Sequence, residues 1–245
     1  MSGEVVVIQA EIGSVPYRAI SHLATLVPEL PGFALIGGLA VIVRLGQAHR
    51  ATNDIDAVTD DQIGLLDALV ADGLDRRGDS VLLDADLKLD VIDVSEGDAD
   101  YLPFTTHRFA FDTRSPVEIV VRPTDGAPTS ATIDVARASA LVAVKLGISE
   151  GVGRQRDTRK VGSDAFDVVR LLQRFGPDAL AEELLALGGS DFVERVSDLA
   201  QRHLIEDADR TTAAITRSSV QGVQSIGADQ LDLLGRAFTR RLRAS

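Results

Sequence analysis

The residue pattern changes sharply near the middle of this 245-residue chain, and the change limits the folds that the chain can adopt. Up to Ile133, short runs rich in β-branched residues are separated by turn residues, as is typical of strands. After Ile133, apolar residues recur every three or four positions, which is the period of a helix that buries one face. A mixed α/β part followed by an all-helical part indicates two lobes. We therefore expect an α+β fold with a mixed sheet, divided into lobes at residues 1–134 and 135–245.

The same periodicities predict the individual elements of each lobe. In the first lobe, strands are predicted at residues 33–36, 55–58, 81–94, 108–112 and 117–122. Helices in that lobe are predicted at residues 39–45 and 61–74. In the second lobe, helices are predicted at residues 138–148, 165–172, 179–187, 192–204 and 231–238.

The formal charge of −12 is distributed unevenly along the chain. Residues 1–134 hold 22 acidic and 9 basic side chains, whereas residues 135–245 hold 15 and 16. This acidity excludes broad coating of RNA but allows a local contact with one RNA end. The chain has no cysteine, and its four histidines lie far apart, which excludes a thiolate site and a helical zinc pair. Its chemistry must therefore depend on oxygen ligands and charged nitrogen groups.

No segment of the sequence predicts a membrane span or a secretion signal. The apolar stretch at residues 33–43 contains two glycines and is shorter than the roughly 18 residues that a span needs. At the N-terminus, the apolar run at residues 5–8 is short and is flanked by Glu4 and Glu11 rather than by a basic region. We therefore expect a soluble cytoplasmic protein.

A pair of glycines, Gly37 and Gly38, lies between a predicted buried strand and the helix that follows it. Glycines at such a junction let backbone N–H groups approach a phosphate at the positive end of the helix. The pattern therefore favours a phosphate-binding turn. The alternative is a tight strand-to-helix turn with no ligand, which is the commoner use of paired glycines.

Acidic residues on two predicted strands suggest a metal site. Asp54 and Asp56 are two positions apart in a strand, so their side chains point to the same face and can bind one hard cation such as Mg²⁺. A third carboxylate is needed to deprotonate a hydroxyl beside two metal ions, and residues 89–94 offer Asp90 and Asp93 on opposite faces. We select Asp90 because it is more central in the strand, with Asp93 as the alternative.

These motifs together resemble a known enzyme group. The glycine pair, the helix, the run His-Arg-x-Thr-x-Asp-Ile-Asp at residues 49–56 and the later strand residue Asp90 resemble the nucleotidyltransferase fold of the polymerase-β superfamily. More closely, they are similar to the AbiEii/MenT group of toxin–antitoxin nucleotidyltransferases. That group has a helical lysine followed by an aspartate, matched here by Lys145 and Asp167. The resemblance covers roughly residues 33–172.

The resemblance implies a Mg²⁺-dependent enzyme that transfers NMP from an NTP to RNA, most plausibly to the 3′ end of tRNA. Such an enzyme acts as a growth-inhibiting toxin, with a cognate antitoxin as a possible partner. It implies catalytic roles for five residues, of which the first three also bind two metal ions: Asp54, Asp56, Asp90, Lys145 and Asp167. It implies nucleotide binding by Gly37, Gly38, Arg50, Thr52 and Lys145.

Lys145 stands out even without the resemblance, because lysine occurs at only three positions of this chain. A lysine provides a compact point charge, which suits a phosphate or the leaving pyrophosphate. The alternative is a partly buried lysine whose ammonium reaches water and has no role. Asp167 has alternatives as well, because it could pair with Arg170 or favour the first turn of a helix capped by Ser163.

Two further features concern the acceptor and the activity. The basic run Arg154, Arg156, Arg159 and Lys160 could bind the phosphates of an RNA end, or it could form a solvated face. Leu39 occupies a position at which these enzymes often have a small hydroxyl residue, and residues 46–49 form a join about two residues longer than usual.

Two other functions therefore stay open. The acidity of the first lobe favours a small polycationic acceptor such as an aminoglycoside-like antibiotic. The leucine at position 39 is consistent with a nucleotide-binding module that has lost activity.

Overall fold

The computed structural model describes residues 4–26, 30, 32–52, 54–148, 158–218 and 226–244. The chain forms two compact units. The sheet unit consists of Met1–Gly97 and Ala110–Arg137, and the helical unit consists of Asp98–Phe109 and Ala138–Ser245. Within the described residues, no helix is long and apolar enough to cross a membrane.

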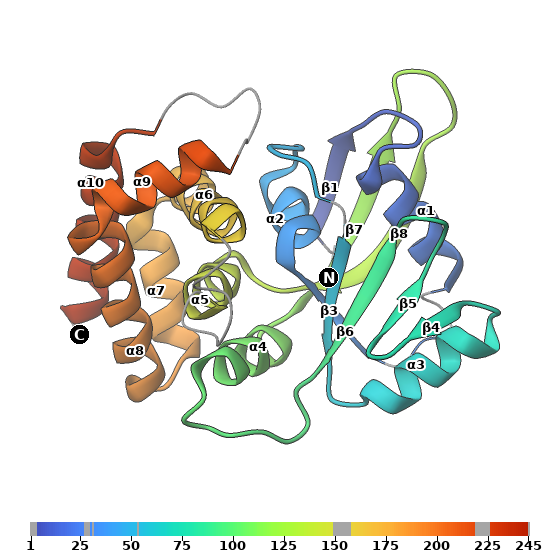
Figure 1. Ribbon diagram of the computed structural model, residues 1–245, viewed down its shortest axis with the longest axis horizontal. Coiled ribbons are helices and arrows are strands. Elements are labelled where there is room, and N and C mark those ends of the chain that lie inside the picture. The colour runs from blue at the N-terminus through green and yellow to red at the C-terminus, as the bar shows by residue number, and fades with distance from the viewer. Residues whose placement is uncertain are drawn as a thin grey trace. The chain divides into compact units, whose positions relative to one another are not determined.

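The sheet unit is built on one mixed sheet, which has eight strands among the described residues (Figure 1). Across the sheet, the strands follow the order β1 (Glu4–Gln9), β7 (Ser115–Arg122), β8 (Thr129–Val135), β2 (Ala34–Ile36), β3 (Asp54–Thr59), β6 (Lys88–Asp93), β5 (Ser80–Leu82) and β4 (Asp75–Arg77). The strand β3 pairs antiparallel with β2 and parallel with β6. The predicted mixed α/β fold is confirmed.

Three helices pack against this sheet: α1 (Val15–Leu26), α2 (Gly37–Leu45) and α3 (Gln62–Ala71). All nine residues of α2 are buried, which agrees with a sequence that is apolar on every side. Its one charged residue, Arg44, donates hydrogen bonds to the carbonyls of Val135 and Ala136 and forms an ion pair with Glu4. A buried guanidinium needs a partner for each donor group. The bonds that satisfy Arg44 therefore attach the end of α2 to the end of β8.

The strand predicted at residues 81–94 is wrong in one respect, because it is two antiparallel strands, β5 and β6. The chain turns between them at Asp84, whose carboxylate accepts the backbone N–H groups of Asp86 and Leu87. Such a side-chain bond to the backbone favours a turn over a continued strand. Arg18 of α1 also binds this carboxylate, and its hydrogen bond holds the pKa of Asp84 well below the usual range.

The strand predicted at residues 108–112 is wrong, because these residues belong to helix α4 (Leu102–Asp112). Phe109 and Phe111 alternate with polar or small residues, which suggested a strand. The buried positions instead include Thr106, Phe109 and Ala110, which lie on one face of a helix. Helical burial therefore outweighs the local alternation.

The helical unit holds the other helices of the described chain (Figure 1). They are α5 (Ala138–Ile148), α6 (Thr158–Phe175), α7 (Pro177–Leu187), α8 (Ser190–Ala200), α9 (Ala208–Arg217) and α10 (Ala228–Arg243), with a π-helix at Gln201–Glu206 between α8 and α9. The five helices predicted in this half are present, and α6 and α10 extend beyond their predicted ends. The sequence patterns did not predict α9.

Candidate active site

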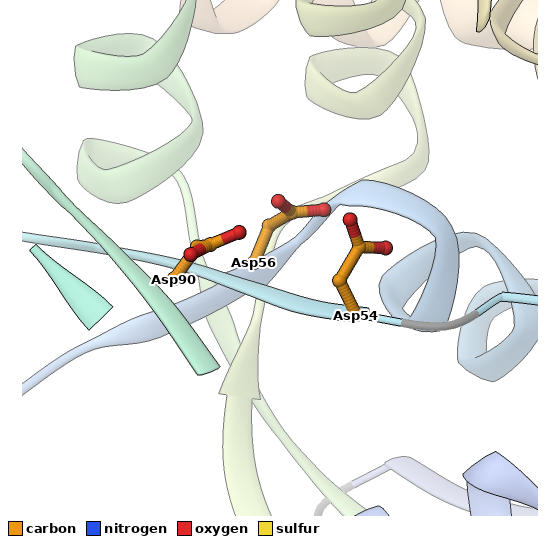
Figure 2. Close-up of side chains that lie close together, drawn as sticks. All are labelled: Asp54, Asp56 and Asp90. Carbon is orange, nitrogen blue, oxygen red and sulfur yellow. The ribbon is translucent and has the colours of Figure 1, made fainter. Parts of the chain in front are cut away.

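Three carboxylates meet on one face of the sheet unit. Asp54 and Asp56 are two positions apart on β3, so their side chains share a face. Asp90 on β6 lies directly opposite Asp56 in the parallel register. One oxygen from each of the three carboxylates lies within 4.8 Å of the others, and Figure 2 shows the three groups directed to the same side. We call this set the acidic triad.

Asp93, the alternative third carboxylate, is not part of this arrangement. Its side chain is exposed, and its Oδ1 atom accepts the backbone N–H of Ser95 at 2.8 Å. Asp90 and Asp93 are three positions apart on β6, so strand alternation directs them to opposite faces.

The turn from β2 into α2 lies directly against the acidic triad. Ile36, the last residue of β2, is opposite Asp56 in the antiparallel register, and Gly37 follows with a φ of +67°. A Cβ atom on Gly37 would lie 1.9 Å from the Oδ2 atom of Asp56. Only glycine fits this position, because both the backbone angle and the nearby carboxylate exclude a side chain. The main chain therefore approaches the carboxylate closely at the start of α2.

Gly38 is packed in the same way against the loop that precedes β3. A Cβ atom at this position would lie 2.8 Å from Nη2 of Arg50 and 2.8 Å from Oγ1 of Thr52. The hydroxyl of Thr52 donates to the backbone carbonyl of Asp54 at 3.2 Å. The structure thus brings together Gly37, Gly38, Arg50, Thr52 and the acidic triad, all within the sheet unit.

A lysine that the sequence analysis gave no role also borders the triad. The Nζ atom of Lys88 lies 2.8 Å from Oδ1 of Asp90. This hydrogen bond raises the pKa of Lys88 against the opposing effect of partial burial, and the charges of Asp90, Asp54 and Asp56 add to the increase. The side chain therefore carries a positive charge at neutral pH.

In the helical unit, Lys145 and Asp167 are buried together with a third residue, Asp164. The Nζ atom of Lys145 on α5 lies 2.6 Å from Oδ1 of Asp164 and 3.0 Å from Oδ2 of Asp167, both on α6. The three residues are 6%, 7% and 0% exposed, respectively. The positive charge of the ammonium offsets negative charge on the two buried carboxylates, and a buried charge without such a partner would be strongly destabilising. Asp164 was not among the predicted site residues, although it lies three positions before Asp167 on the same helix.

The alternatives considered for Asp167 are not seen. Asp167 pairs with Lys145, whereas Arg170 donates a hydrogen bond to the side chain of Gln173. Ser163 does not begin the helix, because α6 starts at Thr158 and the hydroxyl of Ser163 donates to the carbonyl of Lys160.

The structure describes only two of the four residues of the predicted basic run. Arg154 and Arg156 lie outside the described residues, whereas Arg159 and Lys160 are exposed in the first turn of α6.

Comparison with known families identifies the class of enzyme. Residues 18–219 match the model of a family described as the nucleotidyl transferase AbiEii toxin of type IV toxin–antitoxin systems. The chain belongs to the AbiEii toxin family. The predicted enzyme class is therefore confirmed, because AbiEii proteins are nucleotidyltransferases of toxin–antitoxin systems.

Other comparisons add little to this assignment. A solved structure of an H. pylori protein assigned as a nucleotidyltransferase is similar to this AbiEii chain, with 15% identity, a TM-score of 0.48 and coverage of 94% of each chain. No protein with a curated description matches the chain.

Leu39 has a structural role in this AbiEii chain. Its side chain is completely buried in the third position of α2, as part of the hydrophobic core. A contact between this side chain and a bound nucleotide is therefore excluded in the described arrangement. The hydroxyl closest in the sequence to the triad is that of Thr52, which packs against Gly38.

The close approach of Gly37 to Asp56 leads to a testable prediction. If Asp56 acts in catalysis as the sequence predicts, we expect Gly37→Ala to reduce nucleotidyl transfer by about 100-fold or more, because the added methyl group would displace the carboxylate by roughly 1 Å. Transfer of a labelled nucleotide by the purified variant measures this effect. The matched control is Gly46→Ala, at the other end of α2.

Gly46 has a φ of +70°, but a Cβ atom there would meet only Val6, at 4.0 Å. Both substitutions therefore cost about 1–2 kcal/mol of backbone strain, and only the first one displaces Asp56. Equal activity of the two variants would contradict the role assigned to Gly37.

Proposed function

We propose that this AbiEii protein transfers NMP from an NTP to the 3′ end of an RNA acceptor, most plausibly tRNA, and that it inhibits growth as a toxin in this way. The observation that carries the proposal is the convergence of Asp54, Asp56 and Asp90 beside the turn at Gly37. A triad of carboxylates next to a glycine turn at a helix N-terminus can bind a cation and a polyphosphate in adjacent positions. We expect a cognate antitoxin as a partner, as in other toxin–antitoxin systems of this family.

The acidic triad fits divalent cations by its donor set. All three donors are carboxylate oxygens, which hard cations such as Mg²⁺ prefer, and each side chain is partly accessible to solvent. We propose that Asp54, Asp56 and Asp90 hold two Mg²⁺ ions in the working enzyme. When bound, Mg²⁺ would neutralise charge on the phosphates and on the attacking oxygen.

The residues of the chain would divide the transfer step among them. The acceptor hydroxyl oxygen forms a bond to the α-phosphorus of the NTP, and the bond from that phosphorus to the pyrophosphate oxygen breaks. Asp90 accepts the proton of the hydroxyl. The backbone N–H groups at Gly37 and Gly38, together with Arg50 and Thr52, bind the phosphate oxygens.

We extend the proposal to Lys145 and Asp167 of the helical unit. The positive charge of Lys145 would stabilise charge on the leaving pyrophosphate, with Asp167 positioning the ammonium. In this role, Asp164 and Asp167 keep the lysine in one orientation, since both carboxylates bind its Nζ atom.

A second acceptor class has specific support. The acidity of residues 1–134 favours polycationic small molecules such as aminoglycosides over RNA. In favour of RNA, the exposed Arg159 and Lys160 of α6 offer a local contact for phosphates. A third possibility, an inactive nucleotide-binding module, rests on the buried Leu39.

A transfer assay that offers both acceptor classes distinguishes these functions. The purified protein is incubated with Mg²⁺ and each α-labelled NTP in turn, with total tRNA or with an aminoglycoside mixture. We expect label on tRNA, and we expect its loss in Asp54→Ala. Label on the drug alone would assign the small-molecule function. Calorimetric binding of Mg²⁺·NTP without transfer to either acceptor would indicate the inactive module.

A further inference from the structure

Lys88 and the acidic triad form a compact arrangement on two neighbouring strands. Lys88 is opposite Asp54 in the parallel register of β3 and β6, and Asp90 is opposite Asp56. Lys88 and Asp90 are two positions apart on β6, so their side chains share a face. Of these four side chains, three are carboxylates, and the fourth is the ammonium of Lys88, which binds Asp90 at 2.8 Å.

The chain is unusual in having a lysine at this position, because 22 of its 25 basic residues are arginines. An ammonium on a flexible four-carbon stem can leave one oxygen partner for another, whereas a guanidinium forms a rigid two-point contact with a carboxylate. The side chain of Lys88 is 43% exposed, so it has room to change partner. The pair with Asp90 is therefore an exchangeable contact.

A divalent cation at the triad and the ammonium of Lys88 compete for the negatively charged carboxylate of Asp90. A cation that binds Asp90 has to displace the ammonium or stay beside it, and both alternatives weaken its binding. A polyphosphate bound with the cation changes this balance, because its oxygens offer the displaced ammonium a new partner. The same lysine therefore opposes the bare cation and favours the cation together with its phosphates.

We propose that Lys88 couples metal binding to nucleotide binding by exchanging Asp90 for an oxygen of the polyphosphate chain. This inference rests on the proposed function of the triad as a metal site. In it, Lys88 keeps the triad from retaining a divalent cation in the absence of substrate. Lys88 is a positioning and binding residue in this role, and the test reads binding rather than activity.

The test compares two ligands in wild-type protein and in Lys88→Met. Binding of Mn²⁺ alone is followed by the electron paramagnetic resonance signal of the free ion, and binding of Mg²⁺·tripolyphosphate by calorimetry. We expect Lys88→Met to bind Mn²⁺ about fivefold more tightly and Mg²⁺·tripolyphosphate about fivefold more weakly, the upper range for a partly exposed ion pair. Structural damage would weaken both, so opposite changes identify the exchange.

Two control variants separate the possible failures. Arg77→Met removes an exposed positive charge from β4 that pairs with Asp75, outside the triad, and should leave both affinities unchanged. Asp56→Asn should abolish Mn²⁺ binding. If neither wild-type protein nor Lys88→Met binds Mn²⁺, the proposed function itself fails. If wild-type protein binds Mn²⁺ and Lys88→Met binds it equally or less tightly, the triad stands as the metal site and the coupling role of Lys88 is wrong.

Discussion

If the acidic triad binds the catalytic metal ions as we propose, Asp56→Asn should reduce nucleotidyl transfer by about 1,000-fold or more, since loss of one metal-binding carboxylate removes several kcal/mol of transition-state stabilisation. Asp56 is the central member of the triad, because it is opposite Asp90 and directly beside Gly37. Asparagine keeps the shape of the side chain, so the fold around Gly37 is preserved while one anionic donor is lost. The rate of label transfer at saturating Mg²⁺ and NTP measures the effect.

The matched control for this variant is Asp93→Asn on β6. Asp93 is exposed and binds only the backbone of Ser95 among the contacts seen here, and it points away from the face of Asp90. We expect this variant to keep transfer activity within about twofold of wild type, as for other surface substitutions. Loss of activity in Asp93→Asn together with full activity in Asp56→Asn would contradict the assignment of the triad.

Lys145→Met should lower the free energy of unfolding by about 3 kcal/mol or more, the usual range for removing one partner of a buried ion pair. The substitution leaves Asp164 and Asp167 buried without the ammonium that lies within 3.0 Å of both. Urea unfolding followed by circular dichroism at neutral pH measures the loss. Transfer activity should fall as well if the proposed role at the pyrophosphate is correct.

Two further variants test the physical reason for this destabilisation. Lys160→Met, which replaces an exposed lysine of α6, should change stability by no more than about 0.5 kcal/mol. The double substitution Lys145→Met with Asp167→Asn should recover part of the loss, because a neutral amide costs less to bury than a carboxylate that has lost its ammonium partner. A double variant less stable than Lys145→Met would show that the buried charge is not the cause.

The acidic triad was largely predictable from the sequence, because strand alternation is a local property. The period of two places Asp54 and Asp56 on one face and separates Asp90 from Asp93 wherever the strands lie in the sheet. The position of Lys88 opposite Asp54 was not predictable. It depends on the register between β3 and β6, which is set by pairing between distant segments.

The sequence analysis also missed the first strand, β1. In β1, Val5 and Val7 are exposed and Ile8 is fully buried, so the burial alternates, but residues 5–8 are all apolar and the sequence itself shows no alternation of apolar and polar residues. Within the part of the chain that the structure describes, β1 lies at an edge of the sheet and pairs with one strand, β7. In the helical unit, Lys145 is only 6% exposed and its ammonium binds two buried carboxylates, so it is buried more deeply than a lysine whose ammonium reaches water. Its partners could not be predicted from the local pattern, because they belong to a different helix.

The most direct test of the central claim is a crystal structure of the protein with Mn²⁺ and a non-hydrolysable NTP analogue, with anomalous scattering used to locate the metal. We expect an anomalous peak within coordination distance of Asp54, Asp56 and Asp90, with the phosphates of the analogue against the backbone of Gly37 and Gly38. A metal bound elsewhere, with the acidic triad unoccupied and the analogue away from the glycine turn, would contradict the account.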